Sequence, residues 1–91
     1  MIIVSYDISD DKLRTKFSKF LKRFGRMLQY SVYEINNSKR ILDIVMVEIH
    51  DRFEPKFSQS DSVMIFQLSE SCEITRFGYA KNEEYDMIII T

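Results

Sequence analysis

The sequence is poor in cysteine, proline and glycine, with one, one and two of these residues among 91. A lone Cys72 forms neither an intrachain disulfide nor a cysteine-based zinc site, which excludes secreted disulfide scaffolds and indicates a reducing, cytoplasmic location. No apolar run approaches the roughly 20 residues that cross a bilayer, so no membrane partner is expected. With only Gly25 and Gly78, the chain lacks the glycine-rich loops of nucleotide-binding folds.

The remaining composition predicts a single folded domain over residues 1–91. Hydrophobic residues make up 45% of the chain and charged residues 30%, and there is no low-complexity tract or internal repeat. A chain of this length buries only about 60–65% of the surface that its unfolded form exposes, so its own core is small. Association with a second subunit is therefore expected.

Charge is divided unevenly along the chain, although the net charge is only −1. Residues 1–40 contain nine basic and four acidic side chains, whereas residues 41–91 contain four basic and ten acidic ones. Seven bases and no acid lie within residues 12–26, and this unrelieved charge favours a phosphate partner over a merely solvated helix face. The bases expected to bind nucleic acid are Lys12, Arg14, Lys16, Lys19 and Arg26.

Hydrophobic patterning predicts a strand followed by a helix at the start of the chain. Residues 1–6 (MIIVSY) are an apolar, β-branched run without helical periodicity, which is typical of a buried strand. Ser9 or Asp10 can cap a helix whose apolar positions 13, 17, 20, 21 and 24 form one stripe. Gly25 is a suitable residue to end that helix.

The rest of the chain predicts a second helix and further strands. Residues 27–35 (MLQYSVYEI) are strand formers, as one bent strand or as two strands separated near Ser31. Residues 36–38 form a turn or cap before a helix over residues 41–53, which Pro55 closes. Strands are expected at 62–68, 73–79 and 87–90, the last suited to pairing with a neighbouring chain. The order β-α-β-α-β-β predicts an α+β, ferredoxin-like sandwich with two helices on one face of an antiparallel sheet.

Few residues are suited to catalysis. His50 lacks a second histidine or cysteine as partner and is expected to be solvated, and nothing basic flanks Cys72 to activate its thiol. Asp10 and Asp11 fit a helix cap and a first-turn acid. Asp7 directly follows the apolar strand, where a carboxylate either forms a turn or binds a cation such as Mg²⁺. One aspartate makes a weak metal site, which a twofold dimer with two copies of Asp7 would complete.

Three motifs in this order resemble the small CRISPR-associated endonuclease (endoribonuclease) family, the dimeric subunit of the spacer-acquisition complex. Residues 6–8 read Tyr-Asp-Ile after the first strand. Residues 29–34 read Gln-Tyr-Ser-Val-Tyr-Glu after the basic helix, and residues 61–63 read Asp-Ser-Val at the start of a later strand. The resemblance covers nearly the whole chain, and the combination of the first two motifs at this spacing is specific.

The resemblance implies a ferredoxin-like homodimer in which a C-terminal strand joins the partner's sheet. It also implies that Mg²⁺ or Mn²⁺ is held by Asp7 of both subunits, and it places Tyr6, Ser31 and Tyr33 near the dimer cleft. For Ser31 and Tyr33, strand packing is the alternative. The implied partners are the CRISPR integrase subunit and DNA or single-stranded RNA.

These observations lead to three hypotheses of function. The first is a metal-dependent endonuclease of RNA or DNA in antiviral defence, with Asp7 as its catalytic residue and without an evident general base. The second is a non-catalytic, DNA-binding dimer that bridges integrase subunits during spacer acquisition. The third, a regulatory module that binds neither nucleic acid nor metal, is disfavoured by the basic helix.

Overall fold

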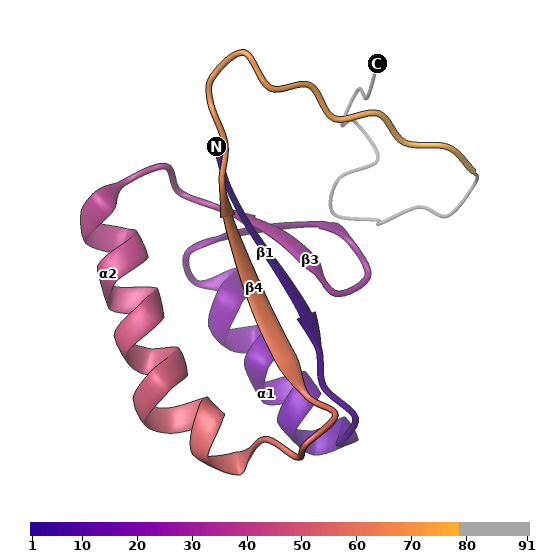
Figure 1. The fold of residues 1–91 in the computed structure, drawn as a ribbon, viewed down its shortest axis with the longest axis vertical. Helices are drawn as coiled ribbons and strands as arrows, with labels where there is room; N and C mark the ends of the chain where they lie inside the picture. Colours follow the sequence, from indigo (N-terminus) through magenta and orange to yellow (C-terminus); the bar gives the residue numbers. More distant parts are fainter. Residues whose placement is uncertain (79–91) are drawn as a thin grey trace.

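The computed structural model describes residues 1–78, which form a four-stranded antiparallel sheet and two helices (Figure 1). The strand order is β2-β3-β1-β4, so the elements follow the β-α-β-β-α-β order of the ferredoxin-like fold. The predicted fold class is confirmed. The elements are β1 (Ile2–Asp7), α1 (Asp11–Lys22), β2 (Gly25–Gln29), β3 (Val32–Ile35), α2 (Lys39–Glu48), the π-helix η1 (Ile49–Phe53), the 3-10 helix η2 (Glu54–Lys56) and β4 (Ser62–Gln67).

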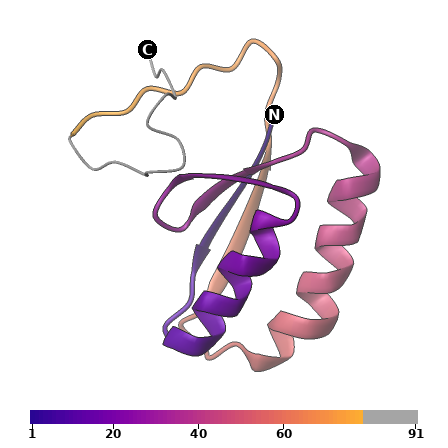
Figure 2. The same cartoon turned by 180° about the vertical axis from the view of Figure 1, so that it is seen from behind.

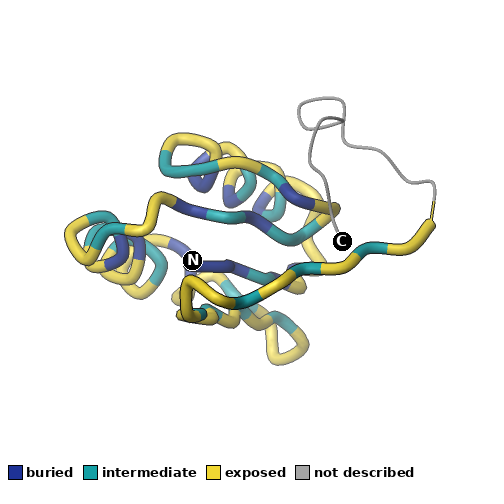
Figure 3. Tube along the Cα trace, turned by 90° about the horizontal axis from the view of Figure 1, so that it is seen from above, coloured by how far each residue is buried: buried dark blue, intermediate teal, exposed yellow. Residues whose placement is uncertain are grey.

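Strand β1 is the centre of the sheet. It pairs with β3 on one side, where Ile2 faces Ile35, and with β4 on the other, where Asp7 faces Ser62. The apolar run at the start of the sequence is explained by burial, because Ile2, Val4 and Tyr6 belong to the core and Ile3, on the other face, lines a hollow with Ile74. In the view from above, buried residues follow the strands and the inner sides of the helices, whereas the outer turns are exposed (Figure 3).

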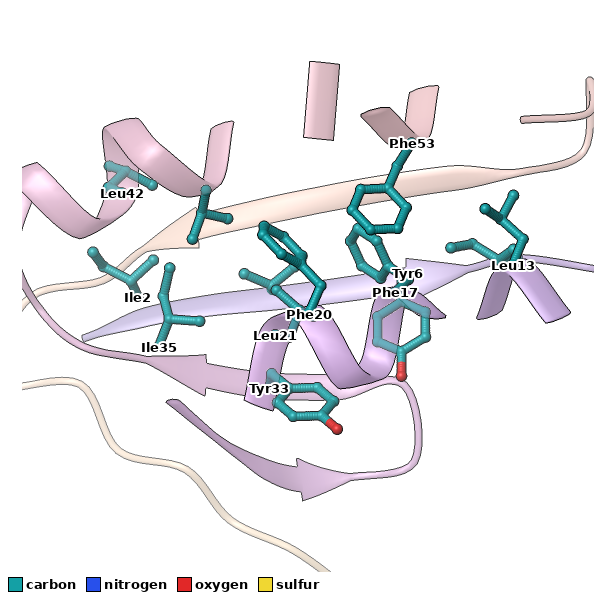
Figure 4. Close-up of a cluster of buried hydrophobic side chains, with 13 residues drawn as sticks. Ile2, Tyr6, Leu13, Phe17, Phe20, Leu21, Tyr33, Ile35, Leu42 and Phe53 are labelled. Carbon is teal, nitrogen blue, oxygen red and sulfur yellow. The ribbon is translucent and has the colours of Figure 1, made fainter. Parts of the chain in front are cut away.

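Both helices pack on one face of the sheet, where aromatic rings form the core (Figures 2 and 4). The ring of Phe53, from η1, contacts both Phe17 and Phe20 of α1, with centroid distances of 5.0 and 5.1 Å. Tyr6 meets Phe17 edge-on at 5.0 Å. Burial of each such ring stabilises the fold by about 1.5–3 kcal/mol relative to an exposed ring. Because the rings come from α1, η1 and β1, their contacts hold the helices on the sheet.

Both helices begin at predicted caps. The Asp10 carboxylate accepts a hydrogen bond from the Leu13 N–H at 2.8 Å, and the Ser38 hydroxyl accepts one from the Ile41 N–H at 3.3 Å. The role predicted for Gly25 is wrong, because α1 ends at Lys22 and Gly25 opens β2. A Cβ at this position would lie 1.9 Å from the Glu34 carbonyl oxygen, so glycine is needed for close strand pairing.

The structure decides one open strand prediction and corrects another. Of the two alternatives for residues 27–35, the pair of strands separated near Ser31 is the one observed: β2 and β3 form a hairpin whose turn places Ser31 at a φ of 65°. The expected order β-α-β-α-β-β is therefore wrong in its middle part. The strand predicted from residue 73 is wrong within the described residues, because residues 73–78 form no strand. Ile74, Thr75 and Arg76 instead lie near the second face of the sheet, where the Arg76 guanidinium donates to the Leu28 carbonyl at 3.1 Å. Residue 79 and the strand predicted at 87–90 lie outside the described residues.

The predicted second helix continues from α2 through η1 to Phe53, and η2 contains Pro55. None of the helices within residues 1–78 is sufficiently long and apolar to cross a membrane.

Candidate functional site

Asp7 is the last residue of β1, and its side chain is exposed. The residues on either side of it, Tyr6 and Ile8, are only 6% and 3% exposed. The backbone at Asp7 is therefore anchored by two buried neighbours and by its pairing with Ser62 of β4. This arrangement presents a carboxylate to solvent on a rigid support, which suits a ligand for a cation.

The turn after Asp7 is held by side chains from two other segments. The Arg14 guanidinium, on α1, donates to the carbonyls of Ile8 at 3.0 Å and Ser9 at 3.4 Å. From the opposite side, the Asp61 carboxylate accepts hydrogen bonds from the Ser9 N–H at 2.9 Å and the Ser9 hydroxyl at 3.0 Å. The Ser9 N–H and the carbonyls of Ile8 and Ser9 are thus all hydrogen-bonded, which fixes the path of the chain beside Asp7.

The Asp61 carboxylate is stabilised in its charged form by these contacts. The backbone N–H of Ser9 and then that of Ser58, at 2.9 Å, lower the pKa of Asp61 from 3.8 to about 2. The sequence motif at residues 61–63 marked this position as the start of a strand, but not as a partner of Ser9. The sequence did contain a signal for such a role of Asp61, because an aspartate beside serines in a polar loop commonly accepts backbone hydrogen bonds.

Arg14 has a structural role that the sequence did not predict. Its side chain also pairs with Asp11, whose hydrogen bond raises the pKa of Arg14 above its usual value. Only 27% of this side chain is exposed. The Arg14 guanidinium therefore supports the turn after Asp7, and its contact with nucleic acid stays a prediction.

The three residues predicted near a cleft lie close to the end of β1, but two of them are buried. The Tyr6 N–H donates to the Ser31 carbonyl at 3.1 Å, which ties the hairpin turn to the strand that carries Asp7. Tyr33 is fully buried, and its hydroxyl shares a hydrogen bond of 2.6 Å with the Ser18 hydroxyl. Burial raises the pKa of Tyr6. Within one chain, both tyrosine rings pack in the core, and Ser31 is the most solvent-accessible of the three residues.

Within residues 1–78, no group of three or more His, Cys, Asp or Glu side chains is placed so that it could hold a metal ion. Asp10 caps α1 and Asp11 pairs with Arg14, so neither joins Asp7 in a ligand set. His50 is exposed and lies 2.8 Å from the Glu54 carboxylate, as an ordinary surface pair. Asp7 fits a divalent ion only as one half of a site that a second copy would complete.

The basic side chains of α1 form an exposed face. Lys12, Lys16 and Lys19 are all exposed, and the first two line a hollow of about 280 Å³ together with Lys56 of η2. Sequence reasoning missed Lys56, because only the tertiary fold brings it to the hollow that Lys12 and Lys16 line. Arg26 lies on β2 at the other end of α1 and pairs with Glu34 at 3.3 Å.

The chain resembles known proteins over most of its length. The family profile described as CRISPR associated protein Cas2 matches residues 1–76. A protein of Methanospirillum hungatei named CRISPR-associated endoribonuclease Cas2 2 is 31% identical over 90 residues, which cover 97% of each chain. A solved structure titled "Crystal structure of cas2" has a TM-score of 0.74 at 27% identity and covers 97% of this chain and 95% of its own. A hypothetical protein, TT1823 of Thermus thermophilus, has a TM-score of 0.69 at 26% identity, with 87% and 93% covered.

Proposed function

The chain belongs to the Cas2 family of CRISPR-associated proteins, and we propose that it is an endonuclease that cleaves RNA or DNA in antiviral defence. The observation that carries this proposal is the exposed Asp7 carboxylate, held at the end of β1 by the turn that Arg14 and Asp61 fix. Relatives named endoribonucleases support phosphodiester hydrolysis as the reaction.

The proposed working unit is a homodimer. The second face of the sheet, which neither helix covers, exposes Met64 and Phe66 of β4 at 56% and 40%. These side chains lie on the same strand as Ser62, which pairs with Asp7. A second copy packed on this apolar face would bury it and bring the two Asp7 carboxylates toward each other.

In this dimer, Asp7 of each subunit would hold Mg²⁺ or Mn²⁺. The bound ion would supply Lewis-acid polarisation of a phosphate and a more acidic water. The protein's own contributions are positional and electrostatic: Arg14 and Asp61 keep the turn beside Asp7 in place, and the lysines of α1 neutralise the backbone of the substrate.

The test compares the parent protein with Asp7→Asn on single-stranded RNA and duplex DNA, with Mg²⁺ or Mn²⁺ present. We expect cleavage to fall at least about 100-fold, because the metal ion would lose a charged ligand. Asp43→Asn, which changes an exposed carboxylate on α2, is the matched control and should cleave normally. Light scattering checks that all variants have the same mass. Undiminished cleavage by Asp7→Asn, or no cleavage by the parent, contradicts the proposal.

A second candidate function is favoured by the basic face of α1. In it, the dimer binds duplex DNA and bridges copies of the integrase subunit in spacer acquisition, without chemistry of its own. The test measures spacer integration by the purified integrase subunit with this protein or its Asp7→Asn variant. Full integration with Asp7→Asn supports the structural role. Loss of integration with Asp7→Asn, but not with Asp43→Asn, contradicts it.

A further inference from the structure

A second basic hollow lies where α1 ends, β2 begins and β3 ends. Its volume is about 560 Å³. Three bases line it: Lys22, Arg23 and Arg26. The exposed amide side chains of Asn36 and Asn37 complete its polar wall.

The sheet register places this hollow at the opposite end of the molecule from Asp7. Gly25 pairs with Ile35, and Ile35 pairs with Ile2 at the start of β1, whereas Asp7 ends that strand. Five residue steps of about 3.3 Å separate the two ends of β1, so the hollow lies about 17 Å from Asp7. It is therefore a site separate from the turn that carries the catalytic aspartate.

The chemistry of this hollow suits a phosphate group. Three bases and one acid, Glu34, line the hollow, so basic side chains outnumber acidic ones in its wall, and Glu34 pairs with Arg26 at 3.3 Å. The Arg23 guanidinium lies 5.5 Å from the centre of the Phe24 ring, a cation–π contact that restrains its orientation. A restrained guanidinium beside amide donors is the arrangement that recognises phosphate oxygens.

A row of exposed bases connects the hollow with the other end of the molecule. Its members recur at helical spacing along one side of α1, so each lies about one turn from the next. From the first to the last, the row rises about 16 Å, close to the distance between the hollow and Asp7. The row consists of Lys12, Lys16, Lys19 and Arg23.

We infer that the hollow binds a backbone phosphate of a single-stranded nucleic acid that runs along this row toward the Asp7 end. This inference rests on the proposed function, because it assumes that the substrate is a nucleic acid. A positively charged track of one-turn spacing follows the backbone of an extended strand and requires no base-specific contact. The hollow then sets a minimum length of nucleic acid for tight binding. Only a nucleic-acid strand that spans about 17 Å reaches from the hollow to the Asp7 end of the row.

The experiment measures binding of a fluorescent 12-nucleotide single-stranded RNA by anisotropy, with EDTA present so that no cleavage occurs. Arg23→Glu and Asn37→Asp both add negative charge to the hollow, and we expect each to weaken binding by about 5-fold or more. The plot of log affinity against log salt should become less steep by about 0.7 for Arg23→Glu, as for one lost phosphate contact. Arg40→Glu is the control, because it makes the same charge reversal at an exposed position on α2 outside the hollow. It should change affinity less than about 2-fold.

The outcomes separate this inference from the proposed nuclease. Equal effects of Arg23→Glu and Arg40→Glu, with Asn37→Asp unchanged, overturn the hollow as a site even if the parent protein cleaves RNA. A selective loss with Arg23→Glu and Asn37→Asp supports it even if cleavage is never observed. Circular dichroism monitors the folding of each variant. If Arg23→Glu does not fold, the binding affinity of the milder Asn37→Asp variant decides whether the hollow binds nucleic acid. Weakened binding of a 12-base-pair duplex alone, with single-strand affinity retained, also overturns it.

Discussion

The carboxylate of Asp61 accepts hydrogen bonds from both the backbone N–H and the hydroxyl of Ser9, at 2.9 and 3.0 Å. These residues are 52 positions apart in the chain. Their contact joins the start of β4 to the turn between β1 and α1, immediately after Asp7. The position of the candidate catalytic carboxylate therefore depends on a residue that is distant in the sequence, as well as on its own strand.

Replacing Asp61 with Asn should alter the stability of the protein in acid. The folded state lowers the pKa of Asp61 from 3.8 to about 2, so the charged group stabilises the fold above pH 4. This contribution is lost as the pH falls from about 4 to 2, because the carboxylate becomes protonated. The melting temperature of Asp61→Asn should thus be lower than that of the parent at pH 7, and the difference should shrink towards pH 2.

Thermal unfolding by circular dichroism between pH 2 and 7 measures this difference. The control is Asp51→Asn, which removes an exposed carboxylate from η1 and should give a melting curve close to the parent's at each pH. A difference between Asp61→Asn and the parent that stays constant over this range contradicts the prediction.

Replacing Tyr33 with Phe tests whether this residue packs or takes part in catalysis. The change removes the hydroxyl that is hydrogen-bonded to Ser18 at 2.6 Å in the core. We expect a loss of about 1 kcal/mol in the free energy of unfolding, and cleavage per folded molecule should be unchanged. Urea unfolding and a cleavage assay measure the two effects. Tyr30→Phe, at a site that is 71% exposed, should be neutral in both. Loss of cleavage with stability retained would instead assign Tyr33 to the active site.

Replacing Gly25 with Ala should disrupt the pairing of β2 with β3. The added Cβ would lie 1.9 Å from the Glu34 carbonyl oxygen and 2.5 Å from the Ile35 Cα, both of which belong to the backbone. Because neither atom can move without shifting β3, we expect a destabilisation of about 3 kcal/mol. Urea unfolding measures it, with Thr15→Ala on the exposed side of α1 as a control that should change stability by less than about 0.5 kcal/mol. An unchanged unfolding midpoint for Gly25→Ala would contradict the close approach of the strands.

Mixed dimers test whether both copies of Asp7 are needed. If each subunit supplies one carboxylate, co-refolding equal amounts of parent and Asp7→Asn chains gives active dimers only where two parent chains meet. Random pairing then leaves about a quarter of the activity of the same total amount of parent protein. If each subunit acts alone, about half remains. A mixture of parent and Asp43→Asn chains should keep full activity.

The local parts of the fold were predictable from the sequence. The five-residue stripe beginning at Leu13 predicted α1, and Asp10 was among its expected caps because a short acceptor can satisfy the free N–H groups of a first turn. The exposed basic face followed from the same periodicity, and the position of Asp7 followed from the apolar run that precedes it. Only nearby residues are needed for these features, so a pattern of a few turns suffices.

Features that join distant segments could not be predicted in this way. The sequence left open whether residues 27–35 form one strand or two. The hairpin requires Ser31 at a φ of 65°, a conformation that serine does not favour locally and that pairing of β3 between β1 and β2 imposes. The requirement for Gly25 likewise comes from the strand beside it.

The sequence by itself determined which chemical groups this protein carries, namely an aspartate at the end of a strand and a helix whose basic residues lack nearby acids. The tertiary structure decided how they are placed. It brought Asp61 to Ser9, Lys56 to the start of α1, and Asn36 and Asn37 to the three bases at its end. The physical reason is that hydrogen bonds and charge clusters depend on distance in space, which only the packing of the helices on the sheet and the register of its strands establish.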